Sequence, residues 1–358
     1  MTLEDQVAGS CGGAKWEGQV GGFVTKMATA IEFYAGIGGF AAAIRPGLLA
    51  SSLLDLELPV MGPLEITSAW DIDVAAIEAY RLNFPSSHGA SSHGASSHGA
   101  RAGEIRSLEI ARLKADLWWM SPPCLPFTRK GKQRDLDDPR SDSMVSLIGK
   151  VHSRLDYPRW IVIENVPPFA DSRGGAWVRE HLEGAGFQCE WEIRCPTELG
   201  WPVRRLRSYL IASRDGLLPL AMLEPKPTPL SVFVDPGNDD DPNLAVPQEW
   251  FERYSKAIDL VDPRDPAAQG ACFTSSYGRM PVRSGSYISP VRGDRNRARF
   301  FSPREVLATL GFGADYRLSE QLSTRRQWSL VGNSLALAVV RWVLGRLPIA
   351  SASASTES

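Results

Sequence analysis

The chain has 358 residues and a formal net charge of −2, and its 43% hydrophobic and 22% charged residues are typical of an ordinary globular protein. This length predicts two domains, or one large domain with an inserted segment. The near-neutral charge excludes a globally basic protein, so any nucleic-acid contact would need a local basic patch.

Cysteine usage and apolar patterning narrow the class further. The five cysteines form no Cys-x-x-Cys pair and no Cys/His cluster, which predicts neither a disulfide framework nor a metal site. The apolar runs are too short for a membrane span and no signal peptide is evident. We therefore expect a cytoplasmic protein without a membrane segment.

Three low-complexity stretches are expected to lie outside the folded part. Residues 1–27 are Gly-rich and read as a disordered leader, with Met27 as the natural start of the protein. Residues 86–100 are three copies of Ser-Ser-His-Gly-Ala, which favour a flexible surface loop over a metal-binding histidine array. Residues 351–358 are expected to form a disordered tail.

Short apolar runs alternate with helical patterns along the first half of the chain. The expected strands are residues 30–34, 64–70, 115–120, 160–163 and 208–212, and the expected helices are residues 74–82, 144–151 and 177–182. This alternation predicts a doubly wound, Rossmann-like α/β sheet.

The domain organisation follows from changes in composition. Residues 28–215 are predicted to form the first part of the main domain, and residues 298–350, with helical patterns at 302–310 and 334–343, to complete it. The small inserted domain between them, residues 216–297, would begin with a Pro-rich acidic linker, Pro225–Pro247.

A glycine-rich turn follows the first predicted strand, in the sequence Phe33–Phe40. Its glycines permit a tight turn and close approach of a ligand to a helix N-terminus. Asp71 ends the next predicted strand, where an acid reaches the ribose of a nucleoside. The Gly-x-Gly-x-x-Gly pattern is absent, which disfavours NAD and favours an adenosyl ligand without a pyrophosphate. Glu104, after a possible third strand, is either near the adenine edge or a surface acid.

Four side chains with catalytic potential lie at the ends of predicted buried strands: a cysteine, a glutamate and two arginines. Cys124 lies in the rigid loop Ser121-Pro122-Pro123-Cys124, and Glu164 ends the run Trp160–Ile163. Arg205 and Arg207 precede another strand, and alternation places them on one side. A thiolate can add to an electron-poor ring while a carboxyl protonates a ring nitrogen and an arginine neutralises a carbonyl oxygen. The thiol would need a nearby cation to ionise near neutral pH.

The inserted segment combines aromatic residues with arginines. The stretch Ala271–Gly278 is followed by Arg279, Arg283, Arg292, Arg295, Arg297 and Arg299, with only Asp294 opposing them. Aromatic stacking and phosphate contacts suit a single-stranded or loop nucleic acid. A solvated basic face is the alternative.

Six ordered elements give the chain a resemblance to the cytosine-5 methyltransferases: Phe33–Phe40, Asp71, Ser121–Cys124, Glu164-Asn165-Val166, Arg205-x-Arg207 and Gly332-Asn333-Ser334. That resemblance implies S-adenosylmethionine as cofactor and Cys124 as the nucleophile at carbon 6 of cytosine. It implies catalytic roles for Cys124, Glu164, Arg205, Arg207 and Cys272. It implies cofactor contacts from Tyr34, Ala35, Gly36, Ile37, Gly38, Gly39, Asp71, Ile72, Glu104, Ser121, Pro122, Asn333 and Ser334.

The string Cys272-Phe273-Thr274-x-x-Tyr277 resembles the signature of the tRNA methyltransferases once classed as a second group of DNA methyltransferases. That subfamily modifies cytosine 38 in the anticodon loop of tRNA-Asp, where bases are already exposed and need no extrusion from a duplex. Substrate contacts would come from Arg129, Lys130, Phe273, Thr274, Tyr277 and Arg279. Met280 stands where a second tyrosine is usual, and Cys272 either assists catalysis or is a buried structural thiol.

The alternative is that the substrate is DNA and that the chain is a DNA cytosine-5 methyltransferase, for example of a restriction–modification system. A non-catalytic nucleic-acid-binding protein is disfavoured, because a decayed site would have lost at least one of Cys124, Glu164, Arg207 or the glycine turn. We expect a monomer.

Overall fold

The computed structural model describes residues 27–51, 62–85, 99–109, 114–128, 133–152, 156–219, 225–254, 256–291, 293–294 and 297–349. The expected leader, the expected tail and most of the Ser-Ser-His-Gly-Ala repeat lie outside these residues. Gly99 and Ala100, which end the third copy of the repeat, begin a strand, so the surface-loop prediction is wrong for them. They pair with Ser68 and Ala69 of the neighbouring strand, which gives their backbone regular partners.

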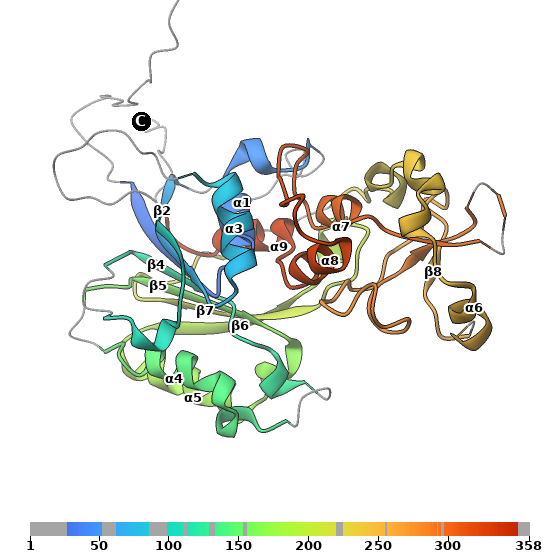
Figure 1. Ribbon diagram of the computed structural model, residues 1–358. Helices are drawn as coiled ribbons and strands as arrows, with labels where there is room; N and C mark the ends of the chain where they lie inside the picture. The colour runs from blue at the N-terminus through green and yellow to red at the C-terminus, as the bar shows by residue number, and fades with distance from the viewer. Residues whose placement is uncertain are drawn as a thin grey trace, which may run out of the picture.

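Seven strands of the described residues form one sheet, in the order β3-β2-β1-β4-β5-β7-β6 (Figure 1). Their bounds are β1 Ala28–Phe33, β2 Leu64–Asp71, β3 Gly99–Ala102, β4 Leu117–Met120, β5 Trp160–Asn165, β6 Gln188–Arg194 and β7 Arg207–Ser213. The strands from β3 to β5 in this order run parallel, whereas β7 is antiparallel to both of its neighbours. The strand order reverses between β1 and β4, and folds of this type bind ligands beyond the carboxyl ends of the strands at such a point. The predicted doubly wound α/β fold is confirmed.

Helices cover both faces of the sheet (Figure 1). The helices α1 (Gly39–Ala43), α3 (Val74–Asn83) and α9 (Leu337–Leu344) lie on one face, and α4 (Asp142–Ile148) and α5 (Arg173–Gly184) lie on the other. Side chains of β4 alternate between two separate cores: Trp119 stacks on Phe40 of α1, whereas Trp118 packs in the core of α4 and α5. Both faces of the central strands are therefore buried, which explains their continuous apolar runs.

Most predicted elements of this layer are confirmed. The helices expected at 74–82 and 177–182 correspond to α3 and α5, and the strands expected at 160–163 and 208–212 correspond to β5 and β7. Strand β6 and helix α8 (Thr324–Gly332) were not among the expected elements. The third strand ends at Ala102, just before Glu104.

A second, smaller sheet lies at the opposite end of the molecule, beside α6 (Gln248–Tyr254) (Figure 1). Its strands, in the order β10-β9-β8, are β8 Leu260–Val261, β9 Tyr287–Ile288 and β10 Arg299–Phe300. Because β10 pairs with β9, the small sheet extends past the boundary expected at residue 297. The core of this sheet is continuous with the core that contains α1 and α9.

The Pro-rich acidic segment is packed against the rest of the protein, so its prediction as a linker is wrong. Leu230, Phe233 and Leu244 are buried in the main core, and the ring of Phe233 lies 5.0 Å from that of Trp201. Polar contacts also join the segment to β10, through Asp239 and Arg299, and to α7 (Pro303–Thr309), through the amide of Asp235 and Glu305. Apolar residues between the prolines were the signal for this packing.

Candidate active site

The glycine-rich turn after β1 is held in a conformation that most residues disfavour. Tyr34, Gly36 and Gly38 have φ values of 57°, 52° and 86°. A Cβ on Gly38 would lie 2.6 Å from Phe84, so this position accepts only glycine. The amide of Gly36 donates a hydrogen bond of 2.7 Å to the carboxylate of Asp71, which joins the turn to the end of β2.

A buried carboxyl group supports the turn from below. Glu32 in β1 is 1% exposed and accepts hydrogen bonds from the amide of Phe40 and the hydroxyl of Tyr80. Burial raises the pKa of Glu32 to about 8, so the carboxyl carries a proton at neutral pH. The sequence analysis missed this residue, although an acid within the apolar run Ala30–Phe33 was a detectable signal.

The groups around this turn fit an adenosyl ligand. A Cβ on Gly36 would meet nothing within 4 Å, so its backbone faces open space. Ile72 is 75% exposed directly after Asp71, which leaves an apolar surface beside a carboxylate. The buried hydroxyl of Ser334 has no hydrogen-bond partner among the described residues, and it lies against Gly39. A ligand with a ribose and an apolar base would use all of these groups.

The other residues predicted to contact the cofactor differ in how deeply they are buried. Ala35 and Ile37 are buried in the turn, whereas Asn333 is exposed beside Ser334. Ser121 accepts a hydrogen bond from Trp119 Nε1, and the carbonyl of Pro122 accepts one from Asn165 Nδ2. Glu104 is exposed after β3.

Strand directions bring the thiol, the carboxylate and the guanidinium to one edge. Cys124 follows β4 and Glu164 lies near the end of the parallel strand β5, so both are at the carboxyl edge of the sheet. Because β7 is antiparallel to β5, its first residue, Arg207, lies at that same edge. Arg207 Nε lies 3.1 Å from Glu164 Oε1, and both side chains are largely buried. The paired charges thus face the loop that carries the thiol.

Burial controls the ionisation of Cys124. Burial raises the pKa of the Cys124 thiol above its ordinary value, although the positive charge of Arg207 opposes this rise. The charge of Glu164 acts in the same direction as burial. The cation expected near Cys124 is therefore present, but it does not make the thiol acidic. Arg140, which was not a candidate, is also close enough for its charge to interact with Cys124.

Arg205 lies beneath this edge and is 4% exposed. Its guanidinium donates to main-chain carbonyls, at 3.0 Å to Phe273, at 3.3 Å to Gly332, and to Ser334. These bonds join the loop of the small domain to the residues beside the glycine turn. Only the two terminal nitrogens are used in these bonds, and the buried Nε has no hydrogen-bond partner among the described residues. The catalytic role expected for Arg205 stays a prediction, while its visible contacts are with the main chain.

Cys272 lies between the two arginines. Its Sγ is 3.7 Å from Arg205 Nη1 and 3.9 Å from Arg207 Nη2. Although burial opposes ionisation, the two guanidiniums hold the pKa of the Cys272 thiol below its ordinary value. The structure thus brings Cys272, Arg205, Arg207, Glu164 and Cys124 into one region.

The aromatic residues of the inserted segment are core residues, which contradicts their expected stacking on substrate bases. Phe273 and Tyr277 are each 1% exposed, and their rings pack edge to face at 5.0 Å. The Tyr277 hydroxyl donates a hydrogen bond of 2.6 Å to the carbonyl of Ser286. Thr274 is tied to Ser284 by its amide. A nucleobase could not reach either ring without unpacking this core.

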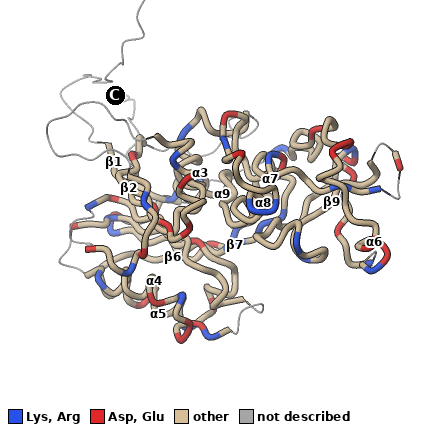
Figure 2. The backbone as a smooth tube through the Cα atoms, in the orientation of Figure 1, with Lys and Arg blue, Asp and Glu red and all other residues tan. Residues whose placement is uncertain are grey.

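The expected basic stripe is only partly at the surface. Arg279 and Arg283 are exposed, and Met280 between them is 47% exposed. Arg299, in contrast, is buried in ion pairs with Asp239 and Glu305, so its predicted role in a nucleic-acid surface is wrong. Figure 2 shows Lys and Arg interspersed with Asp and Glu over both parts of the molecule. Arg129, Lys130, Arg292 and Arg295 lie outside the described residues.

Two broader features of the described residues bear on the class of protein. None of their helices has both the length and the apolar character needed to cross a membrane. Their histidines, cysteines and acids form no group of three or more that could hold a metal ion.

Comparison with known proteins identifies the family. Residues 28–239 match the family described as C-5 cytosine-specific DNA methylase, and the chain belongs to that family. Among its relatives is the tRNA (cytosine(38)-C(5))-methyltransferase of Spodoptera frugiperda, which is 27% identical over 88% of this chain and 97% of the relative. A protein named DNA (cytosine-5)-methyltransferase from Dictyostelium discoideum is also 27% identical, over 88% of this chain and 92% of its own length. The solved structure of the Entamoeba histolytica methyltransferase EhMeth shares the fold, with a TM-score of 0.74 at 23% identity, covering 89% of this chain and 97% of that one.

Proposed function

We propose that the protein transfers a methyl group from S-adenosylmethionine to carbon 5 of a cytosine in tRNA, with cytosine 38 of the anticodon loop of tRNA-Asp as its target. The observation that carries this proposal is the Glu164–Arg207 pair at the carboxyl edge of the sheet, with charges that act on the thiol of Cys124. In a C-5 cytosine methylase, a thiol, a carboxyl and a guanidinium in this arrangement match the three groups that a cytosine ring requires.

The proposed chemistry assigns one task to each of these groups. The Cys124 thiolate forms a bond to carbon 6 of cytosine, which breaks the double bond between carbons 5 and 6 and places electron density on carbon 5. Glu164 first takes up the proton that the Cys124 thiol releases and then donates it to the ring nitrogen, while Arg207 donates a hydrogen bond to the carbonyl oxygen. When bound, S-adenosylmethionine supplies an electrophilic methyl group. Loss of the carbon-5 proton to solvent, return of the ring-nitrogen proton to Glu164 and cleavage of the bond between Sγ and carbon 6 restore the ring and the thiolate.

The cofactor is proposed to lie at the carboxyl edge between β1 and β2. The open backbone of Gly36, the carboxylate of Asp71, the exposed Ile72 and the unpaired hydroxyl of Ser334 would hold it there. The carboxylate would accept the ribose hydroxyls, and Ile72 would cover one face of the adenine.

Two observations favour tRNA over DNA as the substrate. The related enzymes named for cytosine 38 of tRNA, from Bos taurus and Spodoptera frugiperda, match 87% and 88% of this chain and 96% and 97% of their own lengths. An anticodon loop also exposes its bases, so the small second sheet need not drive extrusion of a base from a duplex. The Dictyostelium relative makes DNA the second candidate.

The decisive experiment measures methyl transfer from labelled S-adenosylmethionine to purified total tRNA and, in parallel, to duplex DNA. We expect label in tRNA, and bisulfite sequencing should then locate it at cytosine 38 of tRNA-Asp. Cys124→Ala should abolish transfer while cofactor binding persists. Cys189→Ala is the matched control, because Cys189 is a buried thiol of β6 in the opposite core, with its pKa raised by burial to about 12.

The outcomes separate the candidates. Label in DNA alone would replace tRNA by DNA as the substrate. Turnover by Cys124→Ala equal to that of Cys189→Ala would reject Cys124 as the nucleophile, whichever nucleic acid is labelled.

A further inference from the structure

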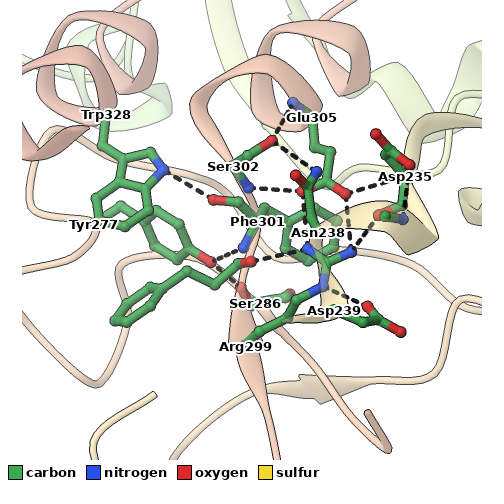
Figure 3. Close-up of polar contacts among 12 residues, drawn as sticks. Asp235, Asn238, Asp239, Tyr277, Ser286, Arg299, Phe301, Ser302, Glu305 and Trp328 are labelled. Carbon is green, nitrogen blue, oxygen red and sulfur yellow. Dashed lines mark hydrogen bonds and ion pairs between the residues drawn. The ribbon is translucent and has the colours of Figure 1, made fainter. Parts of the chain in front are cut away.

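A buried cluster in the small domain lies apart from the thiols and is centred on Arg299 of β10 (Figure 3). A guanidinium has five N–H donors, and each donor of Arg299 meets an acceptor. Nε donates to Asp239 at 2.7 Å, and Nη1 and Nη2 donate to the two oxygens of Glu305 at 2.9 and 3.0 Å. The remaining donors go to the carbonyls of Phe300 and Asp235, both at 3.0 Å.

This cluster joins three separate segments. Asp235 and Asp239 come from the Pro-rich segment, Arg299 from β10, and Glu305 from the first turn of α7. Glu305 also accepts hydrogen bonds from the amides of Asp235 and Ser302, and the Ser302 hydroxyl caps α7 in return. Every acceptor of the buried carboxylate is thus used to fix β10 against α7.

The strand that the cluster fixes carries the next contact along the path to the thiols. Phe301 follows β10 directly, and its amide donates a hydrogen bond of 2.9 Å to the hydroxyl of Tyr277. Its carbonyl accepts one of 2.9 Å from Trp328 Nε1 in α8. Figure 3 shows Trp328, Tyr277 and Phe301 on one side of the cluster, with Ser286 beside them.

Tyr277 and Ser286 extend this path to the segment of Cys272. The Tyr277 hydroxyl donates to the Ser286 carbonyl, and the Ser286 hydroxyl accepts a hydrogen bond of 2.6 Å from the amide of Ala271. Ala271 directly precedes Cys272 in the chain. The hydroxyl of Tyr277 thus joins Phe301, directly after β10, to Ser286, in addition to the pairing of β10 with β9.

Close backbone packing fixes the other side of the same loop. A Cβ on Gly332 of α8 would lie 2.3 Å from the carbonyl carbon of Thr274, and one on Gly278 would lie 2.3 Å from the ring of Trp328. Helix α8 therefore touches the loop at two points. These elements are in direct contact, so a shift of β10 or α8 would displace Cys272 relative to Arg207.

We propose that the Arg299–Glu305–Asp239 cluster is a positioning site for the reaction, which holds the loop of Cys272 in place beside Arg207 through Phe301, Tyr277 and Ser286. The cluster acts through the loop and touches neither substrate nor cofactor. This inference rests on the proposed function for its catalytic consequence, but the placement of the loop can be measured without turnover.

The test compares Arg299→Met with Arg346→Met. Arg346 is a matched control, because it is also buried and also bridges two carboxylates, those of Glu190 and Glu192 in the edge strand β6. Hydrogen exchange of the backbone between residues 271 and 286 should become faster in Arg299→Met and stay unchanged in Arg346→Met. Since a misplacement of about 1 Å can cost on the order of 100-fold in rate, kcat should fall by about tenfold or more in Arg299→Met alone. The KM for S-adenosylmethionine should stay unchanged in both variants.

Two milder variants decide the matter if Arg299→Met fails to fold. Tyr277→Phe removes only the bridging hydroxyl, and Glu305→Gln keeps the capping side chain of α7 but weakens the ion pair. Both should show faster exchange of residues 271–286 and a lower kcat. Wild-type exchange of this segment in the folded variants would overturn the positioning role. Absence of methyl transfer by the wild-type protein would refute the proposed function alone, since the exchange measurement would still stand.

Discussion

Replacement of Arg205 by methionine would separate a positioning role from a chemical one. The substitution keeps much of the apolar stem but removes the donors to the carbonyls of Phe273, Gly332 and Ser334. A buried polar group left without a partner costs about 1–3 kcal/mol. At the lower end of that range, three carbonyls predict a loss of about 3 kcal/mol in the free energy of unfolding.

The functional consequence should affect both halves of the site. Ser334 lies beside the glycine turn, and Phe273 follows Cys272, so Arg205→Met should raise the KM for the cofactor and the KM for the RNA together. Urea unfolding followed by tryptophan fluorescence gives the change in stability, and initial rates with each substrate varied in turn give the two KM values. Arg346→Met is expected to be destabilised as well, with both KM values unchanged.

One result would refute this reasoning. A variant Arg205→Met with the wild-type urea midpoint and both wild-type KM values, but with turnover lost, would place Arg205 in the chemistry instead of in the scaffold.

Two predictions concern pH. Because burial keeps the pKa of the Cys124 thiol above its ordinary value, the rate of methyl transfer under single-turnover conditions should keep rising as pH increases from 7 toward 9. A rate that is already flat at pH 7 would contradict a protonated resting thiol. Burial gives Glu32 a folded-state pKa of about 8, above its ordinary value of 4.5, so the unfolded state releases its proton at lower pH. The wild-type protein should therefore lose stability as pH rises between these two values. Glu32→Gln should remove that part of the slope, measured by urea unfolding at several pH values, and equal slopes in both proteins would show that Glu32 does not titrate as the structure implies.

Local sequence signals were sufficient for the parts of the fold that depend on local structure. The glycine turn and the proline-shaped loop of Cys124 are set by neighbouring residues, so both could be placed from the sequence. The pairing of Glu164 with Arg207 was also foreseeable, because a buried carboxylate at a strand end needs a cation. Strand β6 could have been found, since Gln188–Arg194 alternates polar and apolar residues.

The remaining features depend on partners that are distant in the sequence. Arg299 looks like one member of a basic stripe until Asp239, sixty residues earlier in the chain, is brought beside it. Phe273 and Tyr277 would suit a base-stacking surface or a core equally well. Their ring contacts decide for the core, with Phe273 against Phe301 and Tyr277 against Phe300 of β10 and Trp328 of α8. Arg205 and Arg207 lie two positions apart, yet they have different partners. The deeply buried Arg205 donates to main-chain carbonyls, whereas Arg207 pairs with Glu164.

The pairing of α1 with α9 has a consequence for synthesis of the protein. Gly39 of α1 packs against Leu335, just before α9, and the carbonyl of Ile37 accepts a hydrogen bond from the hydroxyl of Tyr316. The glycine turn leaves the ribosome early, whereas these partners emerge near the end of translation. Until then the nascent chain exposes one apolar face of its sheet, which makes it a candidate for chaperone binding and prone to aggregation. A premature stop before residue 335 would leave that face uncovered permanently, so truncated products should be cleared by proteolysis and not accumulate as partial enzymes.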